Sequence, residues 1–148
     1  MSVDFQQKCK DERLGREGED EVLKILQNKY GDVKKYMSKY CEMDYYITNK
    51  KGDVIHEFEV KTRRVNHDKY PSLVFGFNKY ERSVNALESG IKSTFLWNCR
   101  DGLFFWDLHD PIQQSDEFYF GTIRNIKRND PEDSKAVHVY NQYLLPLT

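Results

Sequence analysis

The chain has 148 residues, which is enough for one domain and too few for two with separate hydrophobic cores. Hydrophobic residues make up 39% and charged residues 32%, as is typical of soluble globular proteins, and no apolar run approaches the roughly 18 residues that a membrane span needs. The net charge of −1 excludes a protein that binds polyanions through its overall charge.

The N-terminal segment MSVDFQQKCKDERLGREGEDE lacks the apolar stretch of a secretory signal, so we expect a cytoplasmic protein with no membrane partner. Its three cysteines, Cys9, Cys41 and Cys99, are widely spaced and form no CxxC pair. This spacing predicts free thiols rather than a disulfide framework or a zinc site. Basic clusters at 34–39, 61–64 and 124–128 are balanced by acidic ones elsewhere, which is compatible with a basic groove beside an acidic pocket.

The first half of the chain predicts a helix followed by three strands. Residues 15–30 have apolar side chains such as Val22 and Leu26 at helical spacing, and Gly31 stands where a helix would end. Acids in the first turns suit the positive end of the helix dipole. Strands are expected at 33–38, 42–48 and 53–63, the last two joined by a two-residue hairpin turn at Lys51 and Gly52.

The second half predicts one more helix and further strands. Residues 66–76 read as irregular because they contain Pro71 and Gly76, and Asn78 is expected to cap a helix over 78–90. Strands are expected at 93–98 and 102–108, with an edge hairpin or added strands at 117–124 and 136–147. The order of elements predicts a single α/β or α+β domain over 1–148.

The stretch HEFEVKTRR, residues 56–64, predicts an amphipathic strand. Side chains alternate between the two faces of a strand, so Glu57, Glu59 and Lys61 share one face. Phe58 and Val60 lie on the other face, where they are expected to meet the core. Packing alone gives no reason for a row of two acids and a lysine.

The hairpin register offers a reason. With a two-residue turn at Lys51 and Gly52, residues whose numbers add up to 103 face each other, which puts Asp44 opposite Glu59. Directly opposed residues have Cβ atoms about 4.5–5.5 Å apart, and like charges there are destabilising unless something neutralises them. Carboxylate oxygens are the ligands that magnesium prefers. The pattern therefore predicts a metal site with Lys61 beside it.

These residues resemble the pattern of the PD-(D/E)XK nuclease superfamily. That pattern is an acid on one strand and then an acid, any residue and a lysine on the next strand, here Met43-Asp44 and Glu59-Val60-Lys61. The helix sequence GREGEDEVLKIL is similar to the acidic helix of Holliday junction resolvases and Mrr-like nucleases. Met43 replaces the usual proline. The resemblance covers about residues 12–108 and leaves 109–148 as an unmatched, β-rich C-terminal extension.

The resemblance implies a restriction-endonuclease-like core, with a mixed central sheet flanked by helices. It also implies a metal-dependent endonuclease that hydrolyses phosphodiester bonds in DNA with Mg²⁺ or Mn²⁺. It implies catalytic roles for Asp44, Glu59 and Lys61. The metal would be held by Asp44, Glu59, the backbone carbonyl of Val60 and Glu19, and the nucleic acid by Arg63, Arg64 and Lys79.

Several alternatives stay open. The helix dipole explains Glu19 nearly as well as metal binding does, and Glu17 or Glu21 could replace it; Glu57 is expected at the rim of the site. The four histidines, His56, His67, His109 and His138, share no ligand spacing and are expected to be structural or on the surface. The rival function is a catalytically inactive nuclease-fold protein that binds nucleic acid or protein. RNA as substrate is not excluded, and cutting both strands of a duplex would suggest a homodimer, since one such site cuts one strand.

Overall fold

The computed structural model describes residues 20–37, 43–108, 116–123 and 134–147. A helix described over residues 20–30, the N-terminal helix, comes first, and residues 15–19 of the expected helix lie outside the described residues. The other elements are β1 (Lys34–Lys35), β2 (Tyr45–Thr48), β3 (Val54–Thr62), β4 (Ser72–Gly76), α2 (Phe77–Glu88), β5 (Lys92–Cys99), β6 (Gly102–Leu108), β7 (Phe118–Ile123), β8 (Ser134–Tyr140), the 3-10 turn η1 (Asn141–Tyr143) and β9 (Leu145–Pro146).

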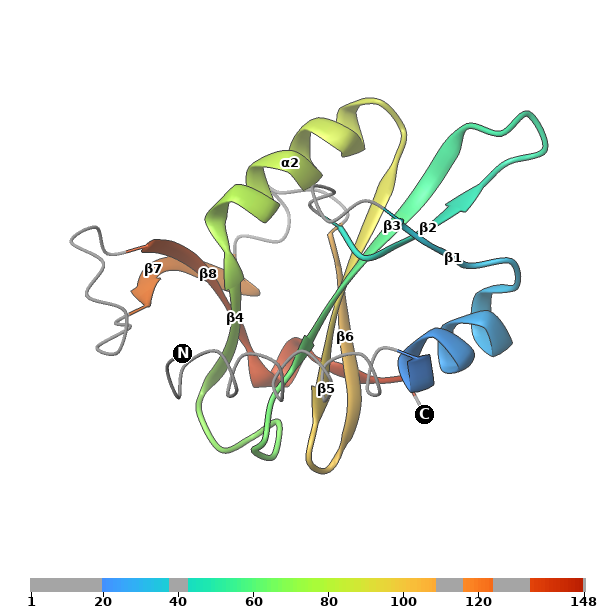
Figure 1. Ribbon diagram of the computed structural model, residues 1–148. Coiled ribbons are helices and arrows are strands. Elements are labelled where there is room, and N and C mark those ends of the chain that lie inside the picture. Colours follow the sequence, from blue (N-terminus) through green and yellow to red (C-terminus); the bar gives the residue numbers. More distant parts are fainter. Residues whose placement is uncertain (1–19, 38–42, 109–115, 124–133, 148) are drawn as a thin grey trace, which may run out of the picture.

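The strands form two sheets (Figure 1). The main sheet has the order β1-β2-β3-β5-β6-β9, and the small sheet has the order β4-β8-β7. In the main sheet only β3 and β5 are parallel, and they are connected through β4 and α2, because parallel neighbours need a long crossover. The fold is therefore α+β with a mixed main sheet, and it contains more strands than the sequence predicts.

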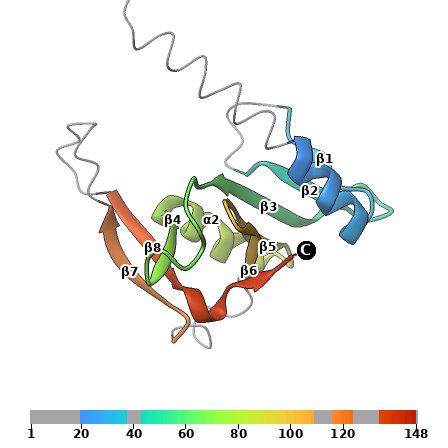
Figure 2. The same ribbon diagram turned by 90° about the horizontal axis from the view of Figure 1, so that it is seen from below.

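The N-terminal helix and α2 cover opposite faces of the main sheet (Figure 2). On the face covered by the N-terminal helix, Val22 and Leu26 of the helix are buried against Tyr45 and Phe58. This packing confirms the helical spacing expected for the N-terminal helix and the apolar face expected for β3. In the described part of the chain, no helix is long and apolar enough to cross a membrane.

The other face of the main sheet carries the larger core, formed with α2 and the small sheet. Phe75 of β4 stacks on Phe95 of β5 with ring centroids 3.8 Å apart. The buried indole of Trp97 donates from Nε1 to the carbonyl of Val74 at 3.1 Å. These contacts fix the small sheet against the main sheet. Helix α2 lies beside the small sheet, over β3 and β5 (Figure 1).

Two local expectations are wrong. Residues 72–76 are strand β4 rather than irregular, with Leu73 and Phe75 buried, because β4 pairs with β8 from the end of the chain. The second helix begins at Phe77, and Gly76 occupies its N-cap without any side-chain hydrogen bond, so Asn78 is not the cap. Within the C-terminal region, β7 and β8 form the expected antiparallel pair and β9 adds to β6 of the main sheet.

The hairpin between β2 and β3 has the predicted register but not the predicted turn. The backbone N–H of Asn49 donates to the carbonyl of Asp53 at 2.8 Å, which leaves three residues in the loop, and Gly52 has a φ of +89°. A register shift between Ile47 and Thr48 compensates for the extra residue. Tyr45 therefore faces Phe58, and this pair and the next two add up to 103 as expected, whereas Thr48 and Val54, on the turn side of the shift, add up to 102.

Candidate metal centre

The polar face of β3 lies on the α2 side of the main sheet. Glu57, Glu59 and Lys61 are in register with Ser93, Phe95 and Trp97 of β5, so the charged row runs beside the larger core. Glu57 and Glu59 are only 3% and 8% exposed. Burial of acids to this extent is uncommon unless each one has a partner.

Asp44 directly precedes β2, whose pairing with β3 ends at Phe58. Its N–H donates to the carbonyl of Phe58 at 2.9 Å, and its Oδ2 accepts from the N–H of Val60 at 2.8 Å. The carboxylate thus replaces a strand carbonyl that β2 is too short to supply. This bond holds the Asp44 side chain against the segment of β3 that carries Glu59.

The carboxyl groups of Asp44 and Glu59 meet, as the register predicts. A hydrogen bond joins the side chains of Glu59 and Asp44, and it favours the protonated form of Glu59. Burial, followed by the negative charge of Asp44, raises the pKa of Glu59 to about 8, while Lys79 and Lys61 act in the opposite direction. One oxygen of Glu59, Oε2, is buried without a hydrogen-bond partner.

Two lysines border this carboxyl pair. Lys79, the third residue of α2, places its Nζ 3.9 Å from Oε2 of Glu59, which brings it to the carboxyl pair itself rather than to an outer surface. Lys61 is half-buried on β3, and burial lowers its pKa while Glu59 opposes that shift. The site therefore combines two carboxyls and two ammonium groups in a largely dry environment.

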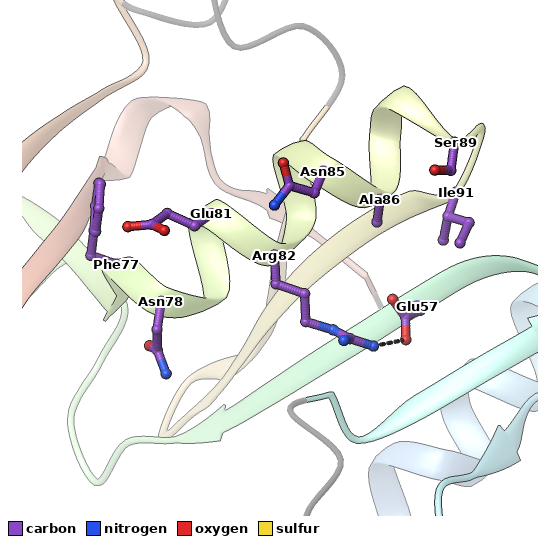
Figure 3. Close-up of a pocket in the computed structure, with 9 residues that line it drawn as sticks. All are labelled: Glu57, Phe77, Asn78, Glu81, Arg82, Asn85, Ala86, Ser89 and Ile91. Carbon is purple, nitrogen blue, oxygen red and sulfur yellow. Dashed lines mark hydrogen bonds and ion pairs between the residues drawn. The ribbon is translucent and has the colours of Figure 1, made fainter.

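The sequence predicted Glu57 at the rim of the site, and this prediction is wrong, because Glu57 is fully buried. Its Oε2 accepts from the Tyr36 hydroxyl at 2.5 Å and from the Arg82 guanidinium at 2.9 Å. Arg82 reaches across from α2 to make this ion pair, and both residues line a groove of about 660 Å³ under the helix (Figure 3). No role for Arg82 was predicted from the sequence. The signal that could have indicated one is its position three residues after Lys79, which places both side chains on the same side of α2.

The remaining predicted site residues are more peripheral or fall outside the description. Arg63 is half-buried just beyond β3, and its Nη1 donates to the carbonyl of Thr62 at 3.3 Å, whereas Arg64 is exposed. Metal binding by the Val60 carbonyl stays a prediction. Glu19 lies outside the described residues.

Two other polar clusters contain histidine. His67 and Asp68 of the loop after β3 and Asp101 of the turn between β5 and β6 have possible ligand atoms within 4.8 Å of one another. His56 lies on the apolar side of β3, as predicted, and its Nε2 is 2.7 Å from the buried hydroxyl of Thr94. Burial lowers the pKa of His56 to about 4, so this ring is neutral and structural.

Comparison with known proteins gives no relative. No family model matches the chain, and neither the curated proteins nor the solved structures contain a significant match.

Proposed function

We propose that this protein is a metal-dependent endonuclease that hydrolyses phosphodiester bonds in DNA, with a restriction-endonuclease-like core and Mg²⁺ or Mn²⁺ as its cofactor. One observation carries the proposal: the buried carboxyl group of Glu59 meets the half-buried carboxyl group of Asp44, and one oxygen of Glu59 has no hydrogen-bond partner. Two acids in such contact stabilise the fold only when a proton or a cation lies between them.

The donor set fits a hard divalent cation. Carboxylate oxygens are the ligands of Mg²⁺ and Mn²⁺, and both ions commonly keep several waters, so two protein carboxylates are a sufficient anchor. Asp44 and Glu59 would hold the ion, with the Val60 carbonyl and Glu19 as further ligands. Glu59 must lose its proton for this, so metal binding is expected to release one proton.

Each side chain around the carboxyl pair has a role in this proposal. A bound Mg²⁺ supplies Lewis acidity toward the scissile phosphate and lowers the pKa of a coordinated water. Lys61 holds a water or a phosphate oxygen by hydrogen bonds as charge develops there. Lys79, next to Glu59, together with Arg63 and Arg64 beyond β3, supplies positive charge for the DNA backbone, which such contacts bind without reading sequence.

Cleavage of plasmid and linear DNA with Mg²⁺ tests the proposal. Asp44→Asn keeps the shape of the side chain and its acceptor for the Val60 N–H, but it removes the charge, so we expect a loss of about 100-fold or more. The matched control is Asp53→Asn, an exposed acid on the same hairpin, which should cleave like the unmodified protein. Full activity of Asp44→Asn would refute the assignment.

The second candidate is a non-catalytic nuclease-fold protein that binds nucleic acid or protein. It is favoured by Lys79, whose ammonium group lies near Glu59 and offers a positive charge without any metal. Calorimetry with Mn²⁺ separates the two candidates. Binding heat that disappears in Asp44→Asn supports the nuclease, and an absence of binding heat in the unmodified protein supports the binding module.

A further inference from the structure

A second hollow lies next to the start of α2, on the side of the small sheet. This aromatic crevice is lined by Phe77, Phe120, Gly121, Thr122 and Lys135 and has a volume of about 320 Å³. That size lies at the lower end of the range for small-ligand sites, roughly 300–1,000 Å³. The side chains that line it are two aromatic rings, one threonine and one cation.

The ring of Phe120 is exposed but held in place. It is 55% exposed, yet it makes edge-to-face contacts with Phe77, Tyr80 and Phe118, with ring centroids 5.4, 5.2 and 5.6 Å away. Edge-to-face packing fixes the plane of a ring. A large aromatic side chain that is both exposed and oriented presents a surface on which another flat group can stack at little cost in conformational entropy.

The charge in the crevice is positive. Lys135 lies on β8 opposite Thr122, and its Nζ is 5.4 Å from the centroid of the Phe77 ring. None of the five residues that line the crevice is acidic. A ligand that suits these groups has a flat ring for Phe120 and a negative charge for Lys135, and a nucleotide unit of a single strand has both.

The crevice adjoins the groove under α2 that contains Glu57 and Arg82. Phe77 lines both hollows, and Figure 3 shows the groove. Glu57, in this groove, lies two residues from Glu59 on the same face of β3. A strand whose phosphate lies at the carboxyl pair would therefore reach the crevice by way of the groove.

We propose that the aromatic crevice stacks an unpaired base of the nucleic acid on Phe120, with a phosphate near Lys135, so that the preferred substrate is single-stranded or locally unpaired. This inference rests on the proposed nucleic-acid substrate. Stacking of a base would give the protein a preference for unpaired strands, which the proposed contacts of Lys79, Arg63 and Arg64 to the nucleic-acid backbone do not provide.

Binding of short labelled oligonucleotides to the full chain, measured by fluorescence anisotropy in EDTA so that no cleavage occurs, tests the inference. Single strands of DNA and of RNA are compared with a duplex and with a single strand that carries abasic positions. Phe120→Leu keeps an apolar side chain but removes the ring, and we expect it to weaken binding of the single strand about 5- to 150-fold, the range for one stacked base. The abasic strand should bind equally weakly to both proteins.

The neighbouring Tyr119 provides a matched control. It is 41% exposed on the same strand but points to the opposite face, where its ring stacks on His138. Tyr119→Leu should bind the single strand like the unmodified protein. A 2-aminopurine base in the strand should be quenched on binding to the unmodified protein and to Tyr119→Leu but not to Phe120→Leu, provided that thermal melts show all three proteins folded.

The outcomes separate this inference from the proposed function. If Phe120→Leu and Tyr119→Leu bind single strands equally, the inference is wrong even where Mg²⁺-dependent cleavage is observed. If cleavage is absent but binding depends on Phe120, the nuclease proposal fails and the stacking site stands. Unchanged oligonucleotide binding together with loss of self-association in Phe120→Leu would make the crevice a protein interface and would overturn the inference.

Discussion

Replacing Glu59 with glutamine should stabilise the metal-free protein, although the residue is buried. Burial and the charge of Asp44 raise the pKa of Glu59 from 4.5 to about 8, so the folded state takes up a proton that the unfolded state has released at pH 7. Each pKa unit corresponds to 1.36 kcal/mol, and the interval from 4.5 to 7 amounts to a cost of about 3 kcal/mol. Glutamine avoids this cost, and its amide can still donate to Asp44.

The stabilisation by Glu59→Gln should increase with pH. An acid whose pKa is raised in the folded state destabilises the fold progressively as pH rises from the unfolded pKa to the folded one. The gain in Glu59→Gln should therefore be near zero at pH 4.5 and reach about 3 kcal/mol at pH 7, as measured by urea unfolding in EDTA. If Asp44 and Glu59 hold Mg²⁺ in the folded state as proposed, addition of Mg²⁺ should stabilise the unmodified protein and should leave Glu59→Gln unchanged.

Glu57 is the matched control for this experiment, since it lies two residues away on the same face of β3. It accepts hydrogen bonds from Arg82 and Tyr36, so Glu57→Gln should destabilise the protein by about 2 kcal/mol. The two substitutions are thus expected to change the free energy of unfolding in opposite directions: Glu59→Gln should raise it and Glu57→Gln should lower it. If Glu59→Gln also destabilises the protein, or if its effect does not change with pH, the account of the carboxyl pair is wrong.

Two further predictions concern the rest of the fold. Burial holds the pKa of His56 at about 4, below the 6.5 of an unfolded chain, so stability should be lost as pH falls from 6.5 to 4; the loss should be about 2 kcal/mol because the ring keeps some solvent contact. Urea unfolding in a Glu59→Gln background should show this loss, and the same slope in His56→Gln would contradict it. A Cβ at Gly121 would lie 2.7 Å from His138 Nε2, so Gly121→Ala should cost about 1–3 kcal/mol, and removing the ring with His138→Ala should relieve most of that cost. An equal cost with and without the ring, in a double-mutant cycle of thermal melts, would exclude the clash.

The meeting of Asp44 and Glu59 could be predicted because a hairpin is a local structure. Alternation placed Glu59 and Lys61 on one face, and the register that joins Tyr45 to Phe58 follows from a turn a few residues away. The predicted turn was one residue too short, yet the register is right because a bulge after Ile47 absorbs the difference. Apolar burial of Phe58 on the other face favours that bulge over a slip, since a slip would expose the ring.

Features that depend on distant parts of the chain could not be predicted in this way. Strand β4 is short and lies between Pro71 and the start of a helix, and it becomes a strand because β8, about 60 residues later, supplies its hydrogen bonds. The burial of Glu57 has the same origin. Its partner Arg82 comes from α2, and alternation along β3 contains no information about which helix face will cover it.

The contrast between Glu57 and Glu59 is the strongest physical argument for a cation at the second position. Both acids are buried on one face of β3, two residues apart, and the fold provides Glu57 with a guanidinium and a phenol. It gives Glu59 another carboxyl group, and the Nζ of Lys79 is 3.9 Å from an oxygen of Glu59 that accepts no hydrogen bond. A protein that only needed stability at this position would be served better by a neutral side chain of similar size. In the proposed function a divalent cation would reverse that comparison, because the carboxyl pair that is costly in the metal-free protein would be the group that binds the ion.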